Sequence, residues 1–264
     1  KYDNEPAYTD PGLLTLYRSQ IGSLNFFSQA TRPDLSYSVS VLCRYLHIPN
    51  ASCFRALKHL NAYLAHTPQL GLVYTSSNTE ELTMEHITTD IAPDKESSVK
   101  LNAFCDANWG GETNVSAKST SGNLIYFGSD LISWSSKLQS TIALSTAEAE
   151  HISAFTTART VIYFRQFLEE LGMRQNSATI IHEDNEACIA QSKNPVNHQR
   201  NRHMLLKYHY LRDIVDQGQA TLIYTKTKDQ LADVMTKPLP APQFNRFLNH
   251  LVQTSPLIST SNPH

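Results

Sequence analysis

Acidic side chains recur at the ends of apolar segments in this sequence of 264 residues. Asp106 and Asp184 each close an apolar run, and Asp233 follows shortly after a third. Glu148 and Glu150 stand where a long amphipathic pattern begins. A helix dipole or a turn cap accounts for one such acid, but not for the recurrence. Carboxylates that meet cannot all ionise without cations, and a set of oxygen ligands favours Mg²⁺ or Mn²⁺.

The periodicity of the apolar residues predicts the elements that must position these acids. Apolar and polar residues alternate over 99–106, which predicts a strand that ends at Asp106. Residues 178–184 and 220–225 are predicted as two further strands, and residues 147–171 as a long amphipathic helix. Because ligands of open α/β sheets collect at the carboxyl ends of strands, we expect the acids to meet at one edge of a sheet.

The pattern between and after these elements completes the order. It predicts two more strands at 122–128 and 131–135, a short helix at 185–192 and a polar loop at 192–203. A further helix ends at Gln217, and a last helix is interrupted by Pro238, Pro240 and Pro242. Three antiparallel strands therefore come first, and helices then alternate with two more strands.

Several segments match one protein family in order and spacing. They are FCDANWGG at 104–111, KSTSG at 118–122, ISWSSKLQ at 132–139, STAEAE at 145–150, the pair Asp184-Asn185, and DQLADVMTKPL at 229–239. Together they resemble the ribonuclease H domain of Ty1/copia-type LTR-retrotransposon Pol polyproteins, over about residues 99–252. The region after the reverse-transcriptase palm of these polyproteins is similar to residues 17–27, 31–36 and 56–64.

The resemblance implies an α/β chain with a ribonuclease H-like fold, a five-stranded mixed sheet flanked by helices, preceded by a small, mostly helical subdomain. It implies an endonuclease that hydrolyses the RNA strand of RNA–DNA hybrids with two Mg²⁺ ions, for which Mn²⁺ can substitute. The catalytic and metal-binding positions of the family match Asp106, Glu150, Asp184 and Asp233. This match selects Glu150 over Glu148, which lies about 200° round the helix and should face solvent or cap it.

Two further details test the match. Glu183 stands where family members usually carry a small or neutral residue, and strand alternation should send it to the opposite side from Asp184. Trp109 and Trp134 are expected in the core rather than as base-stacking platforms.

A basic cluster is the candidate surface for phosphate contacts, which fix position and carry little sequence information. It comprises Lys193, Arg200, Arg202, Lys207 and Arg212. The expected partners are an RNA–DNA hybrid, recognised through its 2′-hydroxyls, and the reverse-transcriptase palm and fingers of the same or a sister polyprotein. The resemblance also implies a location in cytoplasmic virus-like particles, with the nucleus as a second location.

Composition predicts five consecutive parts. They are an extended arm at 1–12, a helical remnant of the reverse-transcriptase thumb or connection at 13–75, a polar linker at 76–98, the ribonuclease H-like domain at 99–252 and a disordered tail at 253–264. The helical part is too small for a polymerase, and no aromatic-x-Asp-Asp motif occurs in the sequence. Polymerase activity is therefore not expected from this chain alone.

Charge and cysteine content exclude some classes of protein. A net charge of −2 gives no overall basicity typical of nucleic-acid binders, so binding would depend on local patches. Four dispersed cysteines without a Cys-x-x-Cys pair argue against a zinc site and a disulfide framework, and fit a reducing compartment. No apolar run approaches membrane-spanning length, so no membrane partner is expected.

Two other classes of function stay open beside the nuclease. The chain begins at Lys1 rather than Met, as an excerpt of a longer protein would. A catalytically silent retroelement remnant or excerpt could keep the fold as a nucleic-acid-binding or assembly module. An integrase of the same superfold is disfavoured, because the acids follow the order Asp-Glu-Asp-Asp.

Overall fold

The computed structural model describes residues 5–74, 99–110, 117–193 and 202–254 of the chain. Within these residues the chain forms two compact units. The sheet unit comprises the described residues within 75–110 and 118–236. The helical unit comprises the described residues within 1–74, 111–117 and 237–264.

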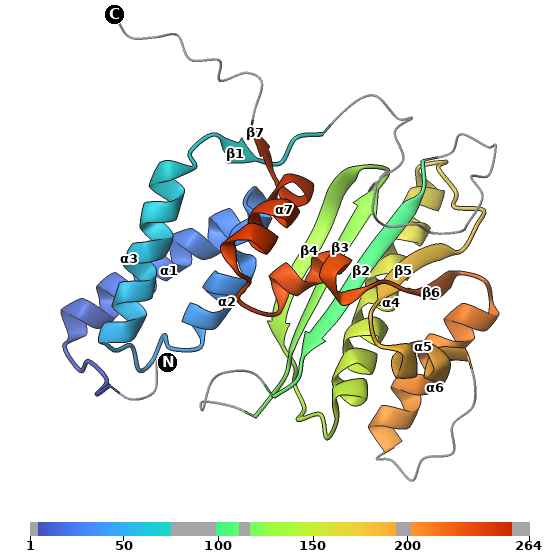
Figure 1. The fold of residues 1–264 in the computed structure, drawn as a ribbon, viewed down its shortest axis with the longest axis horizontal. Helices are drawn as coiled ribbons and strands as arrows, with labels where there is room; N and C mark the ends of the chain where they lie inside the picture. The colour runs from blue at the N-terminus through green and yellow to red at the C-terminus, as the bar shows by residue number, and fades with distance from the viewer. Residues whose placement is uncertain (1–4, 75–98, 111–116, 194–201, 255–264) are drawn as a thin grey trace, which may run out of the picture. The chain divides into compact units, whose positions relative to one another are not determined.

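Five strands in the order β4-β3-β2-β5-β6 form the sheet unit (Figure 1). β2, β3 and β4 pair antiparallel, whereas β5 is parallel to both β2 and β6. Each parallel connection passes through helices, as crossovers between parallel strands require. The strands are β2 Leu101–Asn108, β3 Thr120–Phe127, β4 Asp130–Leu138, β5 Thr179–Glu183 and β6 Ala220–Tyr224. This mixed sheet, flanked by helices, confirms the predicted α/β class and ribonuclease H-like fold.

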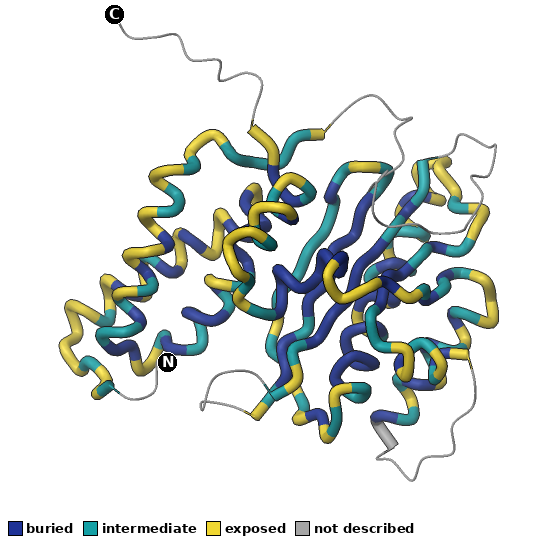
Figure 2. Tube along the Cα trace, in the orientation of Figure 1, coloured by how far each residue is buried: buried dark blue, intermediate teal, exposed yellow. Residues whose placement is uncertain are grey.

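Three helices pack against the strands to form the main core of this unit: α4 Thr146–Glu170, α5 Glu186–Lys193 and α6 Arg202–Asp216. Alternate residues of β2, namely Leu101, Ala103 and Cys105, face this core. After β6 the chain forms two short 3₁₀ segments, η2 Thr227–Asp229 and η3 Leu231–Met235. η3 lies over β2 and β3, and Figure 2 shows that it is buried like the central strands.

Two predictions about the elements near the site were wrong. β2 continues to Asn108, so Asp106 lies inside the strand and not at its end. The region after β6 is not one helix interrupted by prolines. It forms η3 and then, after Pro240, the separate helix α7 Ala241–Leu251. The predicted linker at 76–98 lies outside the described residues, as does most of the predicted loop at 192–203.

The helical unit contains four α-helices and a small two-stranded sheet in its described residues. They are α1 Pro11–Ala30, α2 Ser36–Cys43, α3 Ala51–His66, α7, and strands β1 Leu70–Gly71 and β7 Gln253–Thr254, with the 3₁₀ turn η1 Pro33–Leu35 before α2. α1 begins at Pro11 because the Asp10 carboxylate accepts a hydrogen bond from the Leu13 N–H at 2.8 Å. No helix in the described part of the chain is long and apolar enough to cross a membrane.

The C-terminal segment belongs to this helical unit. β7 pairs antiparallel with β1, and the Phe244 ring of α7 meets the Tyr63 ring of α3 at a centroid distance of 6.2 Å. The prediction of a disordered tail was therefore wrong for residues 253 and 254, while residues 255–264 lie outside the described residues. The compact units also divide the chain at residue 236, whereas the predicted domain extended to residue 252.

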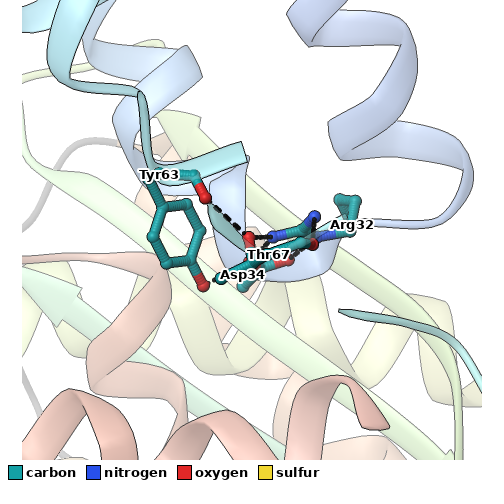
Figure 3. A network of polar contacts seen from close by, with 4 residues as sticks. All are labelled: Arg32, Asp34, Tyr63 and Thr67. Atoms are coloured by element: carbon teal, nitrogen blue, oxygen red, sulfur yellow. Dashed lines mark hydrogen bonds and ion pairs between the residues drawn. The ribbon is translucent and has the colours of Figure 1, made fainter. Parts of the chain in front are cut away.

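A buried ion pair ties the turn after α1 to the end of α3 (Figure 3). The Arg32 guanidinium donates to both oxygens of Asp34, at 3.0 and 2.8 Å, and to the carbonyl and hydroxyl oxygens of Thr67. The Tyr63 hydroxyl donates to Asp34 at 2.8 Å. Only 5% of the Arg32 side chain and none of the Asp34 side chain is exposed. Burial together with the Asp34 charge raises the pKa of Tyr63, so its hydroxyl stays protonated as a donor.

Removing the charge of Asp34 should destabilise the helical unit strongly. Asp34→Asn leaves the Arg32 guanidinium buried without a counter-charge, which costs about 3–5 kcal/mol. Tyr63→Phe is the matched control, because it removes one hydrogen bond to the same carboxylate and should cost only about 1–2 kcal/mol. Urea unfolding followed by circular dichroism measures both changes. Equal and small effects of the two variants would show that the ion pair does not stabilise the fold.

Candidate metal centre

Three of the four predicted acids converge at one edge of the sheet. β2 and β5 are parallel, with Phe104 opposite His182. Asp106 and Asp184 each follow two residues later, so both lie at the same edge of the sheet. α4 begins at Thr146 and places Glu150 in its second turn. Asp106, Glu150 and Asp184 each offer a carboxylate oxygen, and these oxygens all lie within 4.8 Å of one another. The donor set is made of hard oxygen ligands, which suits Mg²⁺ or Mn²⁺.

The electrostatics of this group favour either a proton or a cation. Glu150 is only 7% exposed and Asp106 only 2%, whereas Asp184 is half-buried. Burial, followed by the charges of Glu183, Asp106 and Asp184, raises the pKa of Glu150 well above its usual range. Without positive charge the three carboxylates therefore cannot all ionise cheaply, and a divalent cation would relieve their repulsion.

Asp233 lies outside this group of three. It is located on η3 with 1% of its surface exposed, and no oxygen of Asp233 belongs to the set within 4.8 Å. η3 is nevertheless attached to the site, because the hydroxyl of Thr236 donates a hydrogen bond to the Asp106 carboxylate. Its assignment as a metal ligand thus stays a prediction.

Glu148 caps α4, as predicted. The Ser145 hydroxyl accepts a hydrogen bond from the Glu148 N–H at 3.2 Å, and the Glu148 carboxylate accepts one from the Leu144 N–H at 2.9 Å. This reciprocal pairing satisfies backbone donors at the helix start, in the manner of a capping box. Glu150 is thereby left as the acid of this helix that joins the carboxylate group.

Glu183 is a buried neighbour of the site whose influence was missed from the sequence. Its carboxylate accepts hydrogen bonds from the Cys105 thiol at 3.1 Å and from the Asn185 N–H at 3.1 Å. Cys105 faces the main core, so Glu183 points to the core side, in agreement with strand alternation. Burial raises the pKa of Glu183 to about 8, which favours the neutral form at this position.

The predicted phosphate contacts are only partly described. Lys193 is exposed at the end of α5, while Arg200 and the side chain of Arg202 lie outside the described residues. The Lys207 ammonium lies 5.9 Å from the centre of the Phe155 ring, and partial burial lowers its pKa. Arg212 follows five residues later, about 140° round α6 from Lys207. These two residues therefore face different sides of the helix.

Trp109 is not a core residue, contrary to the prediction. Half of its surface is exposed, and its indole N–H donates to the Ala143 carbonyl at 3.0 Å. The bond joins the end of β2 to the segment that leads into α4. Trp134 on β4 is half-buried.

η3 can approach the site only because Gly122 has no side chain. Gly122 lies opposite Asp106 on β3. A Cβ atom at Gly122 would lie 2.6 Å from the Met235 Cβ and 2.7 Å from the Thr236 Cγ2. Sequence patterns could not predict this contact, because it depends on how an irregular segment folds back over the sheet.

The fold and the carboxylate group define a ribonuclease H-like domain. Over 233 residues the chain is 36% identical to the retrovirus-related Pol polyprotein from transposon RE2 of Arabidopsis thaliana, covering 88% of this chain and 15% of that protein. It is 33% identical over 228 residues to that from transposon TNT 1-94 of Nicotiana tabacum, covering 86% of this chain and 16% of that protein. The chain belongs to this family of Ty1/copia-type retrotransposon Pol polyproteins.

The chain spans about 15% of the length of the first of these relatives. A foamy viral protease–reverse transcriptase in complex with RNA/DNA hybrid aligns with a TM-score of 0.45 at 13% identity, covering 86% of this chain and 26% of that one. No protein-family model matches the chain. The fold assignment accordingly depends on the strand order and connections of the sheet itself.

Filling the space at Gly122 should displace η3. Gly122→Ala places a methyl group closer to Met235 and Thr236 than real contacts allow, so we expect a loss of about 1–3 kcal/mol in the free energy of unfolding. Gly22→Ala in helix α1 is the control, because no atom beyond its neighbours and the backbone of its own helix lies within 4 Å of the added methyl group, and it should gain up to about 1 kcal/mol. Urea unfolding measures both. A Gly122→Ala chain as stable as wild type would contradict the close approach of η3.

Proposed function

We propose that this chain is a ribonuclease H-type endonuclease that hydrolyses the RNA strand of RNA–DNA hybrids with two divalent cations. The approach of Asp106, Glu150 and Asp184 to within 4.8 Å on a ribonuclease H-like sheet is the observation that carries the proposal. Membership of the Pol polyprotein family supports this class of hydrolase.

The placement of three acids and the family match of the fourth support the proposed roles. Asp106, Glu150 and Asp184 hold the cations through their oxygens, and Asp233 supplies a fourth carboxylate from η3. When bound, Mg²⁺ ions, or Mn²⁺ in their place, activate water and stabilise the leaving 3′ oxygen of the RNA. The protein's own contribution is to hold mutually repelling carboxylates in place before any cation arrives.

The proposed substrate contacts are electrostatic and independent of sequence. Lys193, Arg200, Arg202, Lys207 and Arg212 contact phosphates of the hybrid, while the 2′-hydroxyls of the RNA strand distinguish it from DNA. The palm and fingers of a reverse transcriptase, from the same or a sister polyprotein, are the proposed protein partners. Cytoplasmic virus-like particles, and secondarily the nucleus, are the proposed locations.

Loss of a single charge at the site should abolish cleavage. Asp106→Asn keeps the size of the side chain but removes a charged ligand, so we expect Mg²⁺-dependent cleavage of a labelled hybrid to fall by more than about 100-fold. Removing a residue that only orients a metal ligand typically lowers metal affinity or activity by about 10–100-fold, so the loss of a charged ligand itself should exceed that range. Cleavage products on a denaturing gel, with the label on the RNA or on the DNA strand, measure the rate and the strand preference.

Glu148→Gln is the matched control for this experiment. The residue lies two positions from Glu150, and glutamine keeps an oxygen that can accept the Leu144 N–H. Its cleavage rate should stay within a few-fold of wild type, and both variants should bind the hybrid as wild type does. Binding without cleavage by the wild-type chain would contradict the nuclease and favour a binding module.

A further inference from the structure

The segment that follows β6 is fastened to the two strands that carry the site. The side-chain amide of Gln230 donates to the carbonyls of Cys105 at 3.0 Å and His182 at 3.2 Å, and its oxygen accepts the Ala232 N–H at 3.2 Å. Gln230 is fully buried. It therefore bridges β2 and β5 one residue before Asp106 and two residues before Asp184, and it fixes the start of η3 above the sheet edge.

At the other end of η3, Thr236 contacts the site directly. Thr236 is fully buried, and its hydroxyl donates to Oδ2 of Asp106. The carbonyl oxygen of Asp233 lies 3.2 Å from the same hydroxyl. The hydroxyl has one proton for these two acceptors, and when Asp106 is ionised its carboxylate is the stronger acceptor of the two.

The backbone of Asp106 is fixed independently of its carboxylate. The buried hydroxyl of Ser153, on α4, donates to the Asp106 carbonyl at 2.7 Å. The Gly122 carbonyl, at 3.3 Å from the same hydroxyl, is its second acceptor. The position of the strand is thus set by α4, while rotation of the carboxylate about its last bond is restrained by Thr236. The two hydroxyls have separate effects, which can be tested separately.

We propose that Thr236 is a positioning residue of the metal centre. Its hydroxyl holds the Asp106 carboxylate in the orientation that directs an oxygen toward those of Glu150 and Asp184, and so sets the affinity of the site for divalent cations. This inference rests on the proposed function, because it concerns the same carboxylates. Groups that orient a metal ligand typically change metal affinity or activity by 10–100-fold when removed.

Two substitutions separate the hydroxyl of Thr236 from its methyl group. Thr236→Val keeps the shape of the side chain, including the methyl group near Gly122, and removes only the donor. Thr236→Ser keeps the donor and removes the methyl group. A purely structural role, in which Thr236 fills space against β3, predicts that the serine variant is the more damaged of the two.

The experiment measures cation affinity without nucleic acid and then with it. Mn²⁺ is titrated into the full chain, and the free ion is followed by electron paramagnetic resonance. The Mg²⁺ concentration that gives half-maximal cleavage of a labelled hybrid is measured in parallel. We expect Thr236→Val to weaken Mn²⁺ binding and to raise the half-maximal Mg²⁺ concentration by about 10-fold or more. Thr236→Ser should stay within about threefold of wild type in both, and circular dichroism checks that both variants fold.

The outcomes distinguish this inference from the proposed function. If the wild-type chain binds Mn²⁺ but does not cleave, and Thr236→Val weakens binding, the nuclease proposal fails and the positioning role stands. If the wild-type chain cleaves and Thr236→Val matches it in both measurements, the positioning role is overturned. A serine variant weaker than the valine variant, or a wild-type chain that binds no Mn²⁺, would also overturn it.

Discussion

Mutual repulsion among Asp106, Glu150 and Asp184 is the constraint on which the rest of the sheet unit depends. Three carboxylate oxygens within 4.8 Å form an arrangement that a fold does not adopt for its own stability. Parallel pairing of β2 and β5 supplies two of the acids, and the start of α4 supplies the third. Hydrogen bonds from Ser153 and Thr236 then hold Asp106 against this repulsion.

The protein accommodates buried charge in three ways, and the contrast indicates where a cation belongs. In the helical unit, Arg32 and Asp34 neutralise each other in a bidentate pair. Glu183 lies among core residues with its pKa raised to about 8, which favours the neutral form. At the sheet edge the charges of Glu183, Asp106 and Asp184 add to burial in raising the pKa of Glu150, and Asp184 leaves the group partly open to solvent. A proton on Glu150, whose pKa is raised, or a divalent cation would balance it.

The sequence was sufficient to predict the strands and their order along the chain, because these depend on local patterns, and Asp106 and Asp184 were expected to meet. Alternation located β2 and β5, and the rule that ligands gather at strand ends brought Asp106 and Asp184 together. The choice of Glu150 came from the family match, and the capping role of Glu148 followed from helix geometry.

The remaining features depend on contacts between distant segments, which periodicity does not encode. η3 reaches Asp106 because Gly122 lacks a side chain, and Thr236 is separated from Asp106 by 130 positions. The same holds for β7, in which Gln253 and Thr254 pair with Gly71 and Leu70 of β1, far away in the sequence. Trp109 was assigned to the core by its residue type, although half of its surface is exposed and its indole N–H bonds to the carbonyl of Ala143.

Crystals grown with Mn²⁺ would test the central claim most directly, because anomalous scattering locates the ion without reference to activity. The account predicts an anomalous peak within bonding distance of carboxylate oxygens from Asp106, Glu150 and Asp184, and its loss in crystals of Asp106→Asn. A well-ordered site with no peak between these residues, or with Mn²⁺ bound only elsewhere on the chain, would contradict it.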